Sequence, residues 1–359
     1  MTQPLTAADA LPSPLATAAR RFLLDRQARH WLERIDPLLS LGEIRARVVG
    51  IGRETPEVKT FVLEPNARWK GHRAGQHTIV EVAIDGVRHR RPFTIASAPG
   101  QGTLALTIKK VPDGLVTGFL HDRLRTGAVV GLSPAQGEFV LPEAGAERPL
   151  FVTAGSGITP ALAMLGELAQ AGRLRDATLV HHAKSDADVI ALERLTEWAG
   201  QGLELFVQTD DGPGPKGFDP AHFAGLVPAF GERETWLCGP AGLMARVEAL
   251  YDARGAGRQL HQERFVARPV VVRGGRSVQV TLRRSGRTVE LDGQGSLLEQ
   301  LERAGEKPAH GCRMGICQTC RCPKVSGVTR DRETGALSTD PQPIRLCVSD
   351  ARSDLELDL

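Results

Sequence analysis

The stretch Cys312-Arg-Met-Gly-Ile-Cys317-Gln-Thr-Cys320, followed 27 positions later by Cys347, decides how this 359-residue chain is interpreted. Five of the six cysteines fall within the last 50 residues, which is too few and too clustered for a disulfide scaffold. The spacing C-x4-C-x2-C sets three thiolates on one tight loop, and a distant residue supplies the fourth. Gly311 and Gly315 let that loop fold closely, so that its backbone N–H groups can hydrogen-bond to sulfur. The pattern predicts a metal site.

Two kinds of metal centre use four cysteines. A plant-type [2Fe-2S] cluster has this spacing, whereas structural zinc sites usually pair two C-x2-C knuckles. The single knuckle therefore favours an iron-sulfur cluster over zinc, with Cys312, Cys317, Cys320 and Cys347 as its ligands. Cys322 lies too close to Cys320 to share the loop geometry, and we interpret it as a non-ligand.

The residues around the cysteines predict a small α+β unit over 276–359. A hairpin, VQVTLRRSGRTVELD, precedes a helix, SLLEQLERAG, and the chain ends in RLCVSDARSDLELDL. With the cysteine spacing, these features resemble the β-grasp ferredoxin family, and the resemblance implies that fold. Gln318 departs from the family pattern, because many members have Gly there.

Length and charge exclude several classes of protein. A chain of 359 residues is long enough for two or three domains. Its formal net charge of +3, from 45 basic and 42 acidic residues, lacks the basic footprint of a nucleic-acid-binding protein. The first 21 residues do not resemble a signal peptide, and no run approaches the roughly 20 apolar residues of a membrane span. We therefore expect a cytoplasmic protein with no nucleic-acid partner.

The rest of the chain predicts a multidomain protein. Residues 1–41 form an N-terminal helical extension, whose apolar stripe either packs on the protein or attaches to a membrane or partner. Residues 42–143 show short alternating runs separated by Gly, Pro and Asp-Gly turns, which predict an antiparallel β-barrel. Residues 144–266 alternate apolar strands with helices, which predicts an α/β domain with a parallel sheet. Residues 267–275 form a linker to the last domain.

Two motifs in the barrel segment suit a flavin. Arg91-Pro92-Phe93-Thr94 ends a predicted strand, where an Arg can pair with phosphate, an aromatic ring can pack on the flavin and a hydroxyl can reach its N5 edge. Gly114-Leu115-Val116-Thr117 enters a helix whose first N–H groups suit a pyrophosphate. Each motif is weak in isolation, since the first also fits an ordinary strand and the second a plain helix cap.

Two further motifs suit a pyridine nucleotide. Thr153-Ala154-Gly155-Ser156-Gly157-Ile158-Thr159-Pro160 follows a strand and precedes a helix, so a pyrophosphate can approach the helix N-terminus past the glycines. Cys238-Gly239-Pro240 ends a later strand, where a thiol can lie beside a nicotinamide ring. A lone buried cysteine is also ordinary core packing.

These four motifs, in this order, resemble the ferredoxin-NADP reductase superfamily over about residues 42–266. The resemblance implies an NAD(P)H-dependent oxidoreductase in which Thr94, Cys238 and Glu263 act at the reacting centre. It implies that the four motifs hold the flavin and the nucleotide, through the residues Arg91, Pro92, Phe93, Thr94, Gly114, Thr117, Gly155, Ser156, Gly157, Thr159, Pro160, Cys238, Gly239 and Pro240. Glu263 and Phe265, in the stretch HQERF, match the position that the family places near the flavin after the last strand. Phe93 replaces the more common Tyr and loses a hydroxyl.

The choice of cofactors leaves alternatives open. Lys184 and Ser185, after the second parallel strand, favour the 2′-phosphate of NADPH, while Asp186 keeps NADH possible. The G-x-x-T turn favours FAD, although similar reductases include FMN enzymes. Electrons would pass from NADPH through the flavin and the [2Fe-2S] cluster to another protein.

Reductases of this three-part type serve ring-hydroxylating dioxygenases, cytochromes P450 and membrane desaturases, so we expect such an acceptor, with peripheral membrane contact possible. The alternative function is a redox sensor that carries flavin and cluster without sustained turnover.

Overall fold

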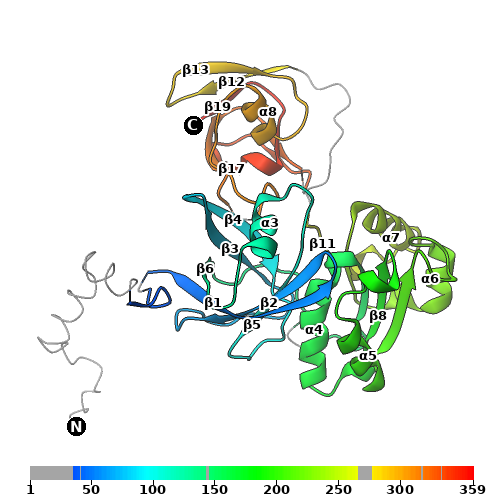
Figure 1. Ribbon diagram of the computed structural model, residues 1–359. Coiled ribbons are helices and arrows are strands. Elements are labelled where there is room, and N and C mark those ends of the chain that lie inside the picture. The colour runs from blue at the N-terminus through cyan, green and yellow to red at the C-terminus, as the bar shows by residue number, and fades with distance from the viewer. Residues whose placement is uncertain (1–34, 41, 143–144, 266–276, 317, 333) are drawn as a thin grey trace, which may run out of the picture.

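The computed structural model of the chain describes residues 35–40, 42–142, 145–265, 277–316, 318–332 and 334–359 (Figure 1). The N-terminal helix predicted before Pro37 lies almost wholly outside the described residues, as do the predicted linker and Cys317. Three sheet-containing units follow one another along the chain, and each has its own buried apolar cluster. Among the helices of the described segments, none has the length and apolar character needed to cross a membrane.

The first unit is a six-stranded antiparallel sheet in the order β4-β3-β6-β1-β2-β5. Alternating side chains such as Phe61 and Leu63 point into a buried cluster, as expected of half-buried strands. Asp85 and Gly86 both have positive φ and form the tight turn of the predicted Asp-Gly hairpin. The elements are β1 Ile44–Thr55, β2 Val58–Pro65, β3 His77–Ile84, β4 Val87–Thr94, β5 Leu104–Lys109, α3 Leu115–Asp122 and β6 Val129–Leu132. This unit is the predicted barrel-like domain.

The second unit is a five-stranded parallel sheet in the order β11-β10-β7-β8-β9. Its strands are nearly continuous apolar runs because helices cover both faces, with α4 and α5 packed in one cluster and α6 and α7 in the other. The elements are β7 Leu150–Ala154, α4 Thr159–Gln170, β8 Thr178–Ala183, α5 Leu192–Gly200, β9 Glu204–Thr209, α6 Pro220–Leu226, β10 Thr235–Cys238, α7 Ala241–Ala253 and β11 Leu260–Glu263. The alternation predicted from the sequence is confirmed.

The third unit combines a five-stranded mixed sheet, β13-β12-β19-β14-β17, with a three-stranded sheet, β16-β15-β18. The helix α8 begins with a capping box between Ser296 and Glu299 and buries Leu297, Leu298 and Leu301. The elements are β12 Val278–Leu282, β13 Arg287–Leu291, α8 Leu297–Arg303, β14 Arg321–Ser326, β15 Thr329–Asp331, β16 Leu337–Ser338, β17 Gln342–Arg345, β18 Ser349–Ala351 and β19 Leu355–Leu357. The cysteine loop lies between α8 and β14.

The third unit contacts the first through the cysteine loop (Figure 1). Ile79 of β3 is only 4% exposed and packs in one cluster with Cys312, Met314 and Ile316. Arg91 of β4 donates a hydrogen bond from Nη1 to the carbonyl of Gly311 at 2.9 Å. The metal-binding loop therefore lies directly against the barrel strands that carry the predicted flavin motif.

Candidate functional site

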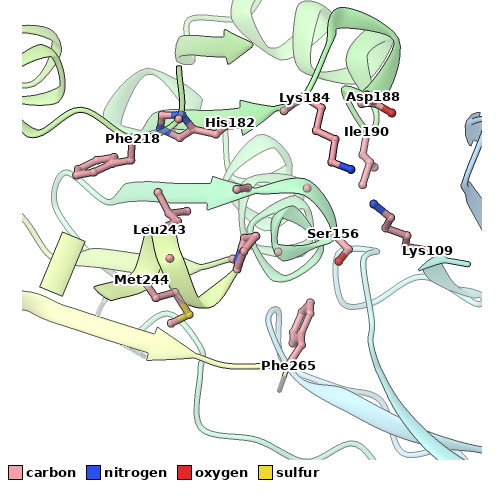
Figure 2. A pocket seen from close by; sticks show the side chains of 18 of the residues that line it. Lys109, Ser156, His182, Lys184, Asp188, Ile190, Phe218, Leu243, Met244 and Phe265 are labelled. Carbon is pink, nitrogen blue, oxygen red and sulfur yellow. The ribbon is translucent and has the colours of Figure 1, made fainter. Parts of the chain in front are cut away.

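A cavity of about 780 Å³ opens at the carboxyl ends of β7, β8 and β10 (Figure 2). Ligands of open parallel sheets bind at this edge, where strand ends and helix starts meet. The barrel contributes the opposite wall through Thr55, Glu57, Val58 and Lys109. Seven of the predicted cofactor-binding residues line the cavity: Gly155, Ser156, Gly157, Gly239 and Pro240 from the two nucleotide motifs, together with Lys184 and Phe265. Thr159, Pro160 and Cys238 are buried and do not line it.

The loop after β7 is shaped by its glycines. The chain makes a single 3-10 turn, Gly155–Ile158, before α4 begins at Thr159 with Pro160 in its first turn. Gly155 has a φ of 51°, in the left-handed region that favours glycine. A Cβ on Gly157 would lie 2.3 Å from the carbonyl oxygen of Cys238, so only glycine fits there. The two nucleotide motifs, 80 residues apart, are thus in backbone contact.

Cys238 ends β10 at the carboxyl edge of the parallel sheet. It pairs in register with Thr153 on β7 and with Glu263 on β11, and it is 1% exposed. Burial raises the pKa of its thiol well above the usual value, with a smaller contribution from the nearby Glu263 carboxyl. The thiol therefore stays protonated and does not act as a nucleophile.

Several charged residues of the cavity have no motif of their own in the sequence. Lys109 ends a barrel strand and forms an ion pair with Glu57 at 3.1 Å. Figure 2 shows its side chain directed towards that of Lys184, which comes from the opposite wall. Asp186, the predicted alternative for binding a ribose, is not a cavity residue, whereas Asp188 is. Other charged or titratable lining residues that the motifs did not indicate are Glu57, His182, Asp210, Arg246 and Arg264.

The barrel motif ends β4 beside β3. Thr94 is 7% exposed and is the register partner of His77, so their side chains share one face of the sheet. Gly114 precedes the first turn of α3 as predicted, but the hydroxyl of Thr117 is already engaged within the turn. It donates to the carbonyl of Gly114 at 3.3 Å and accepts from the N–H of Val111 at 3.2 Å. Thr117 thus shapes the turn.

His77 and Glu263 bring the barrel and the parallel sheet together. The Nδ1 atom of His77 lies 3.9 Å from Oε1 of Glu263, and both side chains are largely buried. Among the described residues, no hydrogen-bond partner is found for either ring nitrogen of His77 or for Oε2 of Glu263. Burial lowers the pKa of His77 and raises that of Glu263 to about 8. Glu263 was predicted from the sequence, whereas His77 was missed.

The cysteine loop gathers thiols and backbone N–H groups. The Sγ atoms of Cys320 and Cys347 are 3.2 Å apart, and the N–H of Gly315 donates to Cys347 Sγ at 3.2 Å. The N–H of Met314 donates to Cys312 Sγ at 3.3 Å. In the part of the chain that is described, which omits Cys317, no set of three or more ligands converges on one point. Cys322 is buried on β14 and, consistent with a non-ligand, its Sγ donates to the carbonyl of Pro323.

Gln318, where many ferredoxins have Gly, has a φ of 57°. This left-handed conformation costs a side chain about 1–2 kcal/mol and costs glycine nothing. The departure noted in the sequence therefore introduces local strain into the loop that carries the cysteines.

Comparison with known proteins agrees with this division of the chain. The model of the oxidoreductase FAD-binding domain matches residues 46–141, and the model of the 2Fe-2S iron-sulfur cluster binding domain matches residues 280–352. These matches cover the barrel and the third unit. Together with the parallel-sheet unit, they define a flavin- and iron-sulfur-containing oxidoreductase.

Several relatives align with this chain over most of its length. An NADPH oxidoreductase of Mycobacterium tuberculosis is 34% identical and is aligned over 92% of this chain and 88% of its own length. The reductase subunit of stachydrine N-demethylase from Rhizobium meliloti is 29% identical, over 80% and 87% of the two chains. The solved structure of phthalate dioxygenase reductase matches with a TM-score of 0.61 and 25% identity, over 89% of this chain and 98% of that one. The chain belongs to the ferredoxin-NADP reductase superfamily and carries a C-terminal [2Fe-2S] ferredoxin domain.

The residues fit both cofactors. Paired thiols with backbone N–H donors suit an iron-sulfur cluster, and the unpartnered polar atoms of His77 and Glu263 beside Thr94 suit a polar flavin edge. When bound, FAD accepts a hydride and releases electrons singly, and the cluster carries one electron at a time.

Proposed function

We propose that this protein oxidises NADPH and delivers the electrons, one at a time, to the oxygenase component of a multi-protein system. The observation that supports this most directly is that the barrel contacts both the nucleotide cavity and the cysteine loop. One side of it closes the nucleotide cavity through Lys109, and another side receives the cysteine loop through Ile79 and Arg91. A flavin on this barrel would therefore lie between the electron donor and the cluster.

The two nucleotide motifs hold the pyridine nucleotide in this proposal. Gly155, Ser156 and Gly157 give the pyrophosphate close access to the start of α4. Gly239 and Pro240 form the wall beside the nicotinamide, backed by Cys238. The thiol lies behind this wall, buried and neutral, so the sheet end that supports the nicotinamide position is apolar.

We assign the flavin to the barrel motif and the cluster to the four predicted cysteines. In this assignment Thr94 would present its hydroxyl to the reacting edge of the flavin, and Pro92 and Phe93 would pack against its ring. Arg91 reaches the flavin phosphates while its Nη1 holds the carbonyl of Gly311. The N–H groups around Gly114 hold the pyrophosphate. Cys312, Cys317, Cys320 and Cys347 bind the iron atoms.

We prefer NADPH to NADH because cations reach the cavity from both walls. Lys184 follows β8, where a ribose 2′-phosphate would be bound, and Lys109 projects towards it from the barrel (Figure 2). The Mycobacterium tuberculosis relative is named as an NADPH enzyme, which supports the same choice.

The proposed acceptor is an oxygenase, because the stachydrine N-demethylase and phthalate dioxygenase relatives are reductases of such systems. A cytochrome P450 or a membrane desaturase belongs to the same proposal, and in the second case residues 1–41 would make the peripheral membrane contact. We propose domain bounds of 42–143, 144–266 and 276–359, joined by a linker over 267–275. We propose that the protein is located in the cytoplasm, because that compartment keeps cysteine thiols reduced and supplies NADPH.

The experiment compares NADPH and NADH as donors to cytochrome c, using the wild type and Lys184→Ala. Lys184→Ala removes one charge-assisted contact, which is worth about 1.5–3 kcal/mol. We therefore expect kcat/KM for NADPH to fall by roughly 10- to 100-fold, and kcat/KM for NADH to stay within twofold of the wild type. Lys70→Ala, an exposed residue outside the cavity, serves as the control. An equal loss with both nucleotides would contradict the assignment of Lys184. Reduction of the protein without continued turnover would favour the redox sensor.

A further inference from the structure

The guanidinium group of Arg345 lies against the cysteine loop. Arg345 ends β17, two residues before Cys347, and its Nη1 donates a hydrogen bond to the carbonyl of Gly315 at 3.0 Å. The N–H of the same glycine donates to Cys347 Sγ at 3.2 Å. Gly315 has a φ of 75°, and a Cβ there would lie 2.9 Å from Arg345 Nη1, so glycine lets the cation approach this closely. A single residue therefore links a positive charge to a cysteine sulfur.

A carboxylate holds this guanidinium in place. Asp331, at the end of β15, accepts a hydrogen bond at Oδ2 from Nη2 of Arg345 at 2.8 Å. Its Oδ1 accepts from the N–H of Thr334 at 3.0 Å, and its backbone pairs in register with Ser349 on β18. The side chains of Arg345 and Asp331 are 28% and 26% exposed, so solvent screens their charges only in part. The guanidinium is thus fixed from two sides, by β15 and by the cysteine loop.

An arginine of this kind can serve stability alone, since its ion pair with Asp331 joins the five-stranded sheet to the three-stranded sheet. That role is complete without the bond to Gly315, which brings the charge to the loop that carries the cysteines. An iron-sulfur cluster becomes more negative when it accepts an electron, so a nearby cation stabilises the reduced form more than the oxidised form. Plant-type clusters have low reduction potentials, and a fixed cation makes such a cluster a better electron acceptor.

We propose that Arg345 is a positioning residue that raises the reduction potential of the [2Fe-2S] cluster, because Asp331 and the carbonyl of Gly315 fix its positive charge at the cysteine loop. The carboxylate of Asp331 offsets part of this effect, because its charge has the opposite sign. Arg345 is the member of the pair whose Nη1 contacts the loop, so its charge outweighs that of Asp331 there. The inference rests on Cys347 as a cluster ligand, which is part of the proposed function.

The first test measures the cluster potential in the full-length protein loaded with FAD and cluster. Anaerobic equilibration with mediator dyes, followed by electron paramagnetic resonance, gives the reduced fraction without using NADPH or a protein acceptor. In Arg345→Gln the equilibrium constant for cluster reduction falls about tenfold, which is about 59 mV for one electron. Arg287→Gln is the matched control, because it removes the same charge from an exposed arginine on β13, at the opposite edge of the same sheet. A potential that does not move in Arg345→Gln, or that moves equally in Arg287→Gln, would overturn the proposal.

The second test separates the charge of the pair from its fastening of the two sheets. Asp331→Asn removes the negative charge but keeps a side-chain oxygen that can accept from Arg345, so the potential rises, opposite in sign to the change in Arg345→Gln. An arginine that only fastens the sheets would move the potential in the same direction in both variants. A potential that falls or stays unchanged in Asp331→Asn would therefore contradict the proposal, and this variant decides alone if Arg345→Gln assembles no cluster. Retention of the cluster in Cys347→Ser would instead refute the ligand assignment.

Discussion

Replacing Gly157 with alanine tests how closely the two nucleotide motifs must approach. The new Cβ would lie 2.3 Å from the carbonyl oxygen of Cys238 and 2.6 Å from its carbonyl carbon, both backbone atoms at the end of β10. Ordinary contact begins near 3.4 Å, so the loop must move by about 1.1 Å, the difference between 3.4 and 2.3. A displacement of roughly 1 Å at a reacting centre can cost on the order of 100-fold in rate.

We therefore expect Gly157→Ala to lower kcat/KM for NADPH by about 10- to 100-fold, or roughly 1.4–2.7 kcal/mol. The assay follows NADPH oxidation with ferricyanide, and the FAD content of each preparation shows that the barrel is intact. Gly200→Ala is the matched control, because a Cβ on that helical glycine meets nothing within 4 Å. A kcat/KM within twofold of the wild type would refute the close approach of the loop to the nucleotide.

Three further predictions concern the other parts of the site. Cys347→Ser abolishes the visible absorbance of the cluster but not the bleaching of FAD by NADPH, whereas Cys322→Ser keeps both; loss of the cluster in both variants would contradict the ligand assignment. Ile79→Ala removes about 2–5 kcal/mol of packing against the cysteine loop and slows cluster reduction measured by stopped-flow absorbance, while Val49→Ala, at an exposed position, does not. The raised pKa of Glu263 means that unfolding releases a proton between pH 4.5 and about 8, so stability falls as pH rises through that range. In thermal melts Glu263→Gln gains up to about 5 kcal/mol over the wild type above pH 8 and nothing below pH 4.5, and a pH-independent difference would contradict the raised pKa.

The parts of the site that depend on local spacing could be predicted from the sequence. The cysteine loop and the loop from Thr153 to Pro160 each form from a short continuous stretch, in which glycine and proline positions fix the backbone. The order of strands and helices followed in the same way from the change of hydrophobic period near residue 148.

The remaining residues depend on packing between units, which no local pattern encodes. Lys184 and Glu263 were predicted, but Lys109, which approaches Lys184 from another sheet, and His77, which meets Glu263 across 185 intervening positions, were not. Thr117 has the residue type expected for phosphate binding, yet its hydroxyl is used within its own turn. Asp186 likewise has the expected charge, but its Oδ1 accepts from Thr209 instead of lining the cavity.

The central claim is that electrons from NADPH reach the cluster through the flavin bound to the barrel. The most direct measurement is anaerobic mixing of the purified protein with NADPH, followed by visible absorbance and by low-temperature electron paramagnetic resonance. The account predicts that the flavin bands bleach first and that the signal of a reduced [2Fe-2S] cluster then appears, faster with NADPH than with NADH. Bleaching of the flavin without any cluster signal, or a cluster reduced before the flavin, would contradict it.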